Sequence, residues 1–89
     1  MTAAKEWHVD IFIGERDGHT HAEARLRTRD EVTLVGDGRA RLNPSDSDVP
    51  EIGDEVAVAR ALGDLAFKLL HAAADDIEAL THEHVHIHV

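Results

Sequence analysis

Histidine is the first residue type in this sequence whose spacing suggests chemistry. The chain has eight histidines and no cysteine, and four of the histidines alternate with other residues at the C-terminal end. These four are His82, His84, His86 and His88. Side chains two residues apart on a strand point to the same side, so the four imidazoles would form a row able to ligate Zn²⁺ or Ni²⁺. The pair His19 and His21 has the same spacing.

The histidine pattern also has a simpler explanation. Histidine-rich tracts often bind metal adventitiously, and a closed zinc site needs three or four converging ligands. We therefore expect no resident cofactor, and metal binding through the tail is the alternative function. The tail, residues 83–89, is expected to be either a short strand or disordered.

Arginine is the second candidate, because it recurs at alternate positions of two predicted strands. The set is Arg25, Arg27, Arg29, Arg39 and Arg41. Alternation would place these side chains on one face of a sheet, and guanidinium groups bind phosphate oxygens bidentately, so this face could receive an RNA backbone. Carboxylates are interleaved with them, at Asp10, Glu23, Glu31 and Asp37. The favoured interpretation is therefore a solvated face with cross-strand ion pairs, with a partner surface as the alternative.

Catalysis has little support in the sequence. Asp75, Asp76 and Glu78 form a carboxylate cluster, but acids are common at the start of a helix, where one is predicted. The glycines Gly36 and Gly38 lack the third glycine and the strand-to-helix context of a dinucleotide fingerprint. We expect a protein that is not an enzyme.

Three segments have the alternating pattern of half-buried strands, approximately residues 7–13, 20–29 and 32–42. Glu15-Arg16-Asp17-Gly18 and Asp30-Glu31 are the predicted turns between them. The third segment carries Gly36 and Gly38 on its predicted inner face. Glycine weakens a strand interior, so we expect a helix to approach the sheet closely there.

A long amphipathic helix follows the strands. Its start is predicted between Asp48 and Asp54, with Asp54 favoured because Gly53 would weaken a helix. The predicted sheet-facing stripe is Val56, Ala59, Leu62, Ala66, Leu69, Leu70 and Ala73. A second short helix is predicted from Asp76 to about Leu80. The expected fold is α+β, with a three-stranded antiparallel sheet packed on one long helix plus a short second helix.

Length and composition limit the class of protein. A chain of 89 residues forms one domain, here 1–89 with a core of 7–82, and its three aromatic residues imply a small aliphatic core that would gain from pairing with a second copy. No signal peptide or membrane span is evident, so we expect a cytoplasmic protein without membrane contact. The formal net charge of −9 argues against nonspecific nucleic-acid binding. Residues 1–42 carry seven basic against eight acidic residues, so any anionic partner would meet this half.

Several strings occur together in a distinctive order over residues 7–82. They are Trp7-x-Val9-Asp10-Ile11-x-Ile13, Ala24-Arg25-Leu26, Gly36-x-Gly38-x-Ala40-Arg41-Leu42-Asn43-Pro44, Val49-Pro50-Glu51-Ile52-Gly53-Asp54-Glu55, Ala59-Arg60-Ala61-Leu62-x-Asp64-Leu65 and Asp76-Ile77-Glu78-Ala79-x-Thr81-His82. In these strings the chain resembles a family of small actinobacterial proteins of unknown function, with mycobacterial members linked to hypoxia and dormancy.

The resemblance implies a fold like a double-stranded-RNA-binding domain (dsRBD-like), assembled as a homodimer. It also implies a likeness to ribosome hibernation-promoting factors, and hence a role in quieting translation under stress, with the ribosome or its RNA as partner. The family has no established catalytic residues to carry over.

Overall fold

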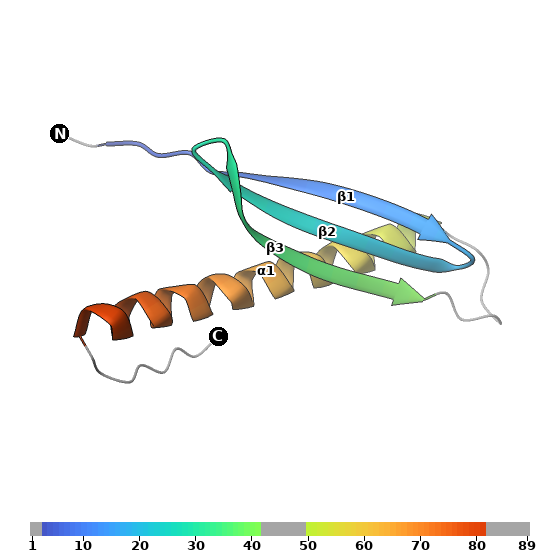
Figure 1. Cartoon of the computed structure of the whole chain (residues 1–89). Coiled ribbons are helices and arrows are strands. Elements are labelled where there is room, and N and C mark those ends of the chain that lie inside the picture. Colours follow the sequence, from blue (N-terminus) through green and yellow to red (C-terminus); the bar gives the residue numbers. More distant parts are fainter. Residues whose placement is uncertain (1–2, 42–49, 82–89) are drawn as a thin grey trace.

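The computed structural model describes residues 3–41 and 50–81, which form one sheet and one helix. The elements are β1 (His8–Arg16), β2 (His19–Thr28), β3 (Glu31–Arg41) and α1 (Pro50–Thr81). The strands are antiparallel in the order β1-β2-β3, and α1 lies across one face of the sheet (Figure 1). The predicted α+β class, with three antiparallel strands and a long helix, is confirmed.

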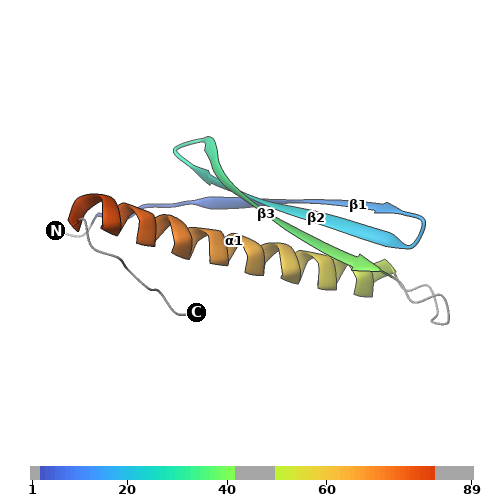
Figure 2. The same ribbon diagram turned by 60° about the horizontal axis from the view of Figure 1, so that its bottom comes forward.

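The strand register confirms the two faces that alternation predicted. Ile11 pairs with Ala24, and Ala24 pairs with Gly36 on its other side. Directly opposed residues in an antiparallel pair point to the same side. The even-numbered residues of β2 from Thr20 to Leu26 are buried beneath α1, while the odd-numbered ones remain at least partly exposed. The molecule therefore has two layers, and the outer sheet face has no layer of described residues over it (Figure 2).

Two tight turns join the strands, and both use left-handed backbone conformations. Asp17 and Gly18 have φ values of 51° and 75°, and Arg29 and Asp30 have values of 53° and 67°. Positive φ at both central residues is the type I′ geometry that suits the twist of a two-residue hairpin. The first turn lies where it was predicted. The second lies one residue earlier than predicted, so Arg29 belongs to a turn and not to the β2 face.

The two strand glycines allow α1 to lie directly on β3. A Cβ added at Gly36 would lie 2.8 Å from the Leu65 Cβ, and one at Gly38 would overlap the Ala57 carbonyl oxygen and the Ala61 nitrogen. Ala57 and Ala61 are themselves fully buried. The prediction that these glycines permit close approach of a helix is therefore confirmed.

The predicted sheet-facing stripe of α1 is mostly wrong, although its member Leu69 does pack against the core. The helix buries Ala57, Ala61 and Leu65 against the sheet, whereas Val56 and Leu62 of the predicted stripe are exposed. Residues four apart share a helix face, so both sets satisfy helical periodicity. The buried set consists mainly of alanine because only small side chains fit against Gly36 and Gly38. Leu65 is buried further along the helix, whereas Val56, Leu62 and Phe67 of α1 are exposed.

The predicted ends of the helix also need correction. It begins at Pro50, four residues before the favoured start. Gly53 lies inside the helix. A Cβ at this position would approach the Thr20 hydroxyl to 2.9 Å, so the close contact with β2 favours glycine here. The predicted separate helix from Asp76 is wrong, because α1 continues without a break to Thr81. Alanine is the best helix former, and the alanines at 72–74 offer no stop signal.

Candidate functional site

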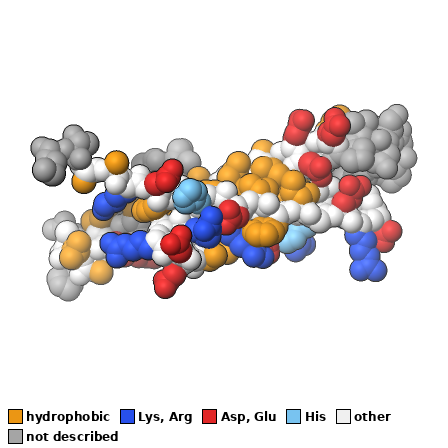
Figure 3. Space-filling model, turned by 90° about the horizontal axis from the view of Figure 1, so that it is seen from above, with side chains coloured by type: hydrophobic (Ala, Val, Ile, Leu, Met, Phe, Trp, Pro, Cys, Tyr) orange, Lys and Arg blue, Asp and Glu red, His pale blue; other side chains and the backbone are white. Residues whose placement is uncertain are grey.

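The outer sheet face carries most of the charged side chains of the three strands in cross-strand rows, whereas Glu15 pairs with the buried Thr20 on the helix side. One row contains Arg16, His19 and Arg41, and the next contains Gly14, His21 and Arg39. Arg25 and Arg27 lie in rows nearer the β2–β3 turn. Figure 3 shows the molecule from above, and in this view basic and acidic side chains lie next to one another around a group of hydrophobic side chains. Arg25, Arg27, Arg39 and Arg41 therefore share one face, as predicted, whereas Arg29 lies in the β2–β3 turn.

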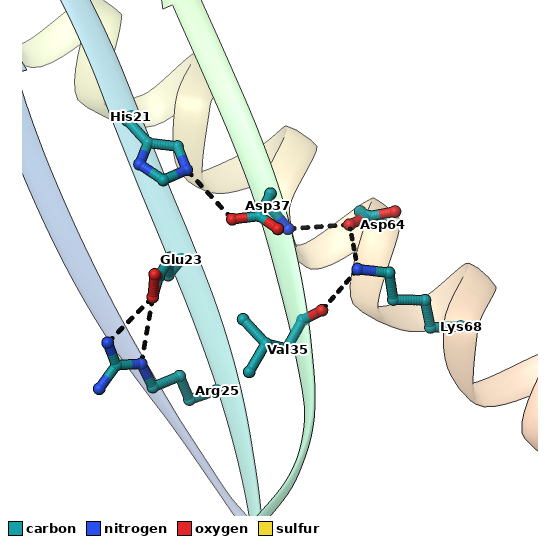
Figure 4. A network of polar contacts seen from close by, with 7 residues as sticks. All are labelled: His21, Glu23, Arg25, Val35, Asp37, Asp64 and Lys68. Atoms are coloured by element: carbon teal, nitrogen blue, oxygen red, sulfur yellow. Dashed lines mark hydrogen bonds and ion pairs between the residues drawn. The ribbon is translucent and has the colours of Figure 1, made fainter.

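The arginines in the middle of this face are engaged by carboxylates. Arg25 donates to Glu23 at 3.0 Å, and its guanidinium carbon also lies 4.1 Å from the centre of the Phe12 ring. Arg27 pairs with Asp10 across the β1–β2 ladder. The favoured ion-pair interpretation describes this part of the face. The predicted pairs of Asp37 with arginine do not form, because Asp37 contacts His21 at 3.1 Å instead (Figure 4).

A second group of arginines lies at the end of the sheet next to the β1–β2 turn. We call it the hairpin-end cluster, and it consists of Arg16, His19, His21, Arg39, Arg41 and Arg60. These residues line an open hollow of about 510 Å³ together with Thr20 and Ala40. In the structure, Arg39 and Arg41 therefore line the same hollow as Arg16 and Arg60, whereas the other predicted arginines do not. The sequence prediction did not include Arg16 and Arg60.

The outer edge of β3 is closed by three side chains of α1 that lie about one helical turn apart. Arg60 donates to the Arg39 carbonyl at 2.6 Å, and Lys68 donates to the Val35 carbonyl at 2.7 Å. Between them, the Asp37 N–H donates to Asp64 at 2.8 Å, and Lys68 also contacts Asp64 at 3.1 Å (Figure 4). These contacts occupy backbone groups that another strand would need for pairing.

The Asp64 contacts predict a pH-dependent contribution to stability. The hydrogen bond from the Asp37 N–H, reinforced by Lys68, lowers the pKa of Asp64. A carboxyl with a lowered folded pKa stabilises the fold above its unfolded pKa of about 3.9, and this contribution is lost as pH falls through the folded value. We expect Asp64→Asn to be less stable than the wild type at pH 7, with the difference shrinking below pH 4. Urea unfolding of both proteins at several pH values measures it, and a difference that stays constant with pH would contradict this role.

A large apolar surface lies on the helix side of β1. Val9, Ile11 and Ile13 point to this side, as their pairing with β2 requires, yet they are 42 %, 37 % and 47 % exposed. They are exposed because α1 packs against β2 and β3 and barely touches β1. On the helix, Val58 and Leu62 line a shallow depression together with Ala59 and the acidic residues Asp54 and Glu55, on the flank turned away from the β3 edge. We call these apolar residues of β1 and α1 together the apolar face.

The predicted metal ligands lie mainly beyond the described residues. His82, His84, His86 and His88 fall within 82–89, which the structure does not describe. Within 3–41 and 50–81, no three or more His, Asp or Glu side chains gather where they could hold a metal ion. In the same ranges, no helix is both long and apolar enough to cross a membrane.

Comparisons with known proteins reveal close relatives. A family model described as Rv2632c-like matches residues 5–86. The uncharacterized protein Mb1767 of Mycobacterium bovis is 58 % identical over 79 residues, which cover 89 % of this chain and 83 % of that protein. The uncharacterized protein Rv2632c of Mycobacterium tuberculosis is 48 % identical over 81 residues, covering 91 % and 86 %.

A solved structure also supports the fold. The crystal structure of Rv2632c is 46 % identical and superposes with a TM-score of 0.81, covering 92 % of this chain and 96 % of that one. These matches confirm the resemblance to a mycobacterial family of unknown function.

Proposed function

Since the chain belongs to the Rv2632c-like family, we propose its function from its own surfaces: it is a non-enzymatic binding protein that acts as a homodimer. The second copy covers the apolar face. The outer sheet face remains free to contact an anionic partner in the cytoplasm, and the ribosome is the proposed partner.

The observation that carries the homodimer is the contrast between the buried and the exposed apolar residues. In the described part, the buried core contains four alanines and two leucines, and no large side chain is fully buried. Twelve large hydrophobic side chains of the same part are exposed. They are Trp7, Val9, Ile11, Phe12, Ile13, Val32, Ile52, Val56, Leu62, Phe67, Ile77 and Leu80. A small domain with so little buried apolar area commonly needs oligomerisation for stability.

The two edges of the sheet indicate where the second copy packs. The side chains of Arg60, Asp64 and Lys68 close the β3 edge. At the opposite edge, β1 carries the exposed apolar side chains Val9 and Ile11 beside the helix flank. Exposed apolar patches of this kind mark interaction sites, and a two-fold dimer can bury the same patch of both copies at once.

The ribosome is proposed as partner for two reasons. The outer face presents arginines from two adjacent strands, and guanidinium groups suit phosphate oxygens. The resemblance adds the dsRBD-like fold, the likeness to hibernation-promoting factors and a role in restraining translation in stressed or dormant cells. The described residues share with that expectation a three-stranded antiparallel sheet and one long helix, and we include the finer features in the proposal.

Sedimentation tests both parts of this function. We expect the pure protein to sediment with twice the 9.8 kDa mass of one chain, and to co-sediment with ribosomes at low salt. Electrostatic contacts with phosphate weaken as salt rises, so the ribosome-bound fraction should fall in high salt. A chain that remains monomeric at all concentrations would contradict the homodimer. A dimer that never enters the ribosome fraction would contradict the partner and leave the homodimer standing.

A further inference from the structure

We propose that the hairpin-end cluster is a binding site for consecutive phosphate groups. This inference rests on the proposed function only in using the outer sheet face as the binding surface. It places the contact at one end of that face and not across the whole arginine set. The ligand chemistry is a short chain of phosphates, supplied either by an RNA backbone or by a free polyphosphate.

The sheet spaces the guanidinium groups of this cluster regularly. Arg39 and Arg41 lie two residues apart on β3, which separates their Cα atoms by about 7 Å. Arg16 lies two strands away in the same row as Arg41, at about 10 Å, with His19 between them. Arg60 reaches the same hollow from α1 and is held by its bond to the Arg39 carbonyl. Several oxyanions can therefore be contacted at once.

The charges of the cluster are less neutralised than those of the middle of the face. Within residues 3–41 and 50–81, neither Arg39 nor Arg41 has a carboxylate partner. Arg16 has only a distant contact of 3.9 Å with Asp17, and both side chains are at least 90 % exposed. By contrast, Arg25 and Arg27 are part-buried in their ion pairs. Free guanidinium groups gain more from a phosphate than groups that already have a carboxylate.

The lining of the hollow favours phosphate over base recognition. It contains no Trp, Phe or Tyr on which a nucleobase could stack, and its aromatic rings are the imidazoles of His19 and His21, of which His21 is already bonded to Asp37. Thr20 and Ala40 are small. Gly14 stands opposite His21, and a side chain added there would meet open space. The row beside the arginines is therefore open to a ligand. We expect binding that depends on charge and does not depend on base sequence.

The net charge of −9 limits the strength and the range of this contact. Most of the excess acid lies in residues 43–89, so the whole molecule repels a polyanion at a distance. Binding must then come from short-range contacts of at most four arginines. For single-stranded RNA, the logarithm of affinity should fall with the logarithm of salt concentration with a slope of about −3 at most.

The test compares two matched double variants of the full chain. Arg39→Gln with Arg41→Gln removes half of the guanidinium groups of the cluster, and Arg25→Gln with Arg27→Gln removes the paired arginines of the same face. Inorganic tripolyphosphate and a single-stranded oligouridine are the probes, in calorimetry and fluorescence anisotropy at low salt. We expect at least a tenfold loss of affinity in the first variant and a clearly smaller loss in the second, because Arg25 and Arg27 already have carboxylate partners. The salt slope for RNA should fall to about −1.4 in the first variant.

Each outcome supports or overturns the site. If the protein binds RNA, with or without tripolyphosphate, and loses this binding in the Arg39/Arg41 variant, the site is supported and its ligand is an RNA backbone. If it binds tripolyphosphate alone, with the same loss, the site is supported and its ligand is a free polyphosphate. Equal losses in the two variants, or no binding of either probe by the wild type, would overturn it. Circular dichroism and the sedimenting mass check that both variants keep the fold and the assembly. A dimer that binds neither probe therefore rejects this site without rejecting the homodimer.

Discussion

Replacing Gly38 by alanine is expected to destabilise the protein by about 3 kcal/mol, the upper part of the usual range for overpacking a core. The added Cβ would overlap the Ala57 carbonyl oxygen and the Ala61 nitrogen. Both atoms belong to the backbone of α1, so no side-chain rotation can relieve the overlap. The helix would have to move away from β3 and lose its alanine contacts. Thermal unfolding should show a midpoint lower by more than about 10 °C for a chain of this size.

The matched control is Gly14→Ala, which adds the same methyl group to a strand glycine with nothing within 4 Å of the new Cβ. Glycine costs about 0.5–1 kcal/mol relative to alanine within a regular element, so this variant should equal or slightly exceed the wild type in stability. If Gly38→Ala were as stable as Gly14→Ala, α1 would not lie on β3 as described. The short distance between α1 and β3 would then be wrong. The exposure of the apolar face, which depends on the position of α1, would be wrong as well.

Replacing Ile11 by serine is expected to dissociate the homodimer. Ile11 points to the helix side of β1 and is 37 % exposed in the single chain. Burying an isoleucine side chain contributes about 1.5–3 kcal/mol, and a two-fold interface contains the residue twice. Since Ile11 is 37 % exposed in the single chain, about a third of this contribution is left for the interface, about 1–2 kcal/mol over both copies, so the variant should raise the dissociation constant by about tenfold or more. Sedimentation velocity over a range of concentrations measures this constant, and circular dichroism separates dissociation from unfolding.

Phe12→Ser provides the control for this prediction. Phe12 is the next residue along β1, is also largely exposed at 48 %, and points to the outer face, where it contacts Arg25. Its replacement removes a larger apolar side chain from the other side of the same strand. We expect the dissociation constant to change by less than about fivefold. If both variants weakened the dimer equally, the second copy would not pack specifically against the helix side of β1.

Alternation in the sequence predicted the sheet well, because a buried strand face must be apolar at every second position. The even-numbered residues of β2, from Thr20 to Leu26, are buried as expected. The glycines at 36 and 38 were also informative, since close approach of a helix was favoured over approach of a ligand as the reason for two glycines on one strand face. These signals are local and do not depend on where the helix lies.

The orientation of α1 could not be predicted in this way. The helix is apolar on more than one side, so periodicity alone does not tell which side meets the sheet. The usual preference for large apolar residues in a core favoured Val56 and Leu62 over Ala57 and Ala61. The glycines of β3 reverse this preference, because they bring the helix too close for large side chains. The steric fit between Gly38 and Ala57 was the signal that could have identified the correct face.

The candidate site was only partly predictable. Alternation placed Arg39 and Arg41 on the outer face, but it could not show that Arg25 and Arg27 are paired with carboxylates. Arg16 and Arg60 join Arg39 and Arg41 through the strand register and the position of α1. Both depend on contacts between segments far apart in the chain. Sequence spacing within one strand carries no such information.

In the proposed homodimer, a second copy covers β1, while α1 covers β2 and β3 of its own chain. Hydrogen–deuterium exchange of residues 8–16 and 31–41, followed over a range of protein concentrations, tests this arrangement most directly. We predict that exchange in residues 8–16 becomes faster as the dimer is diluted, before exchange in residues 31–41 changes. Exchange in residues 8–16 that is independent of concentration, in a protein that is dimeric at the highest concentration, would show that β1 lies outside the interface.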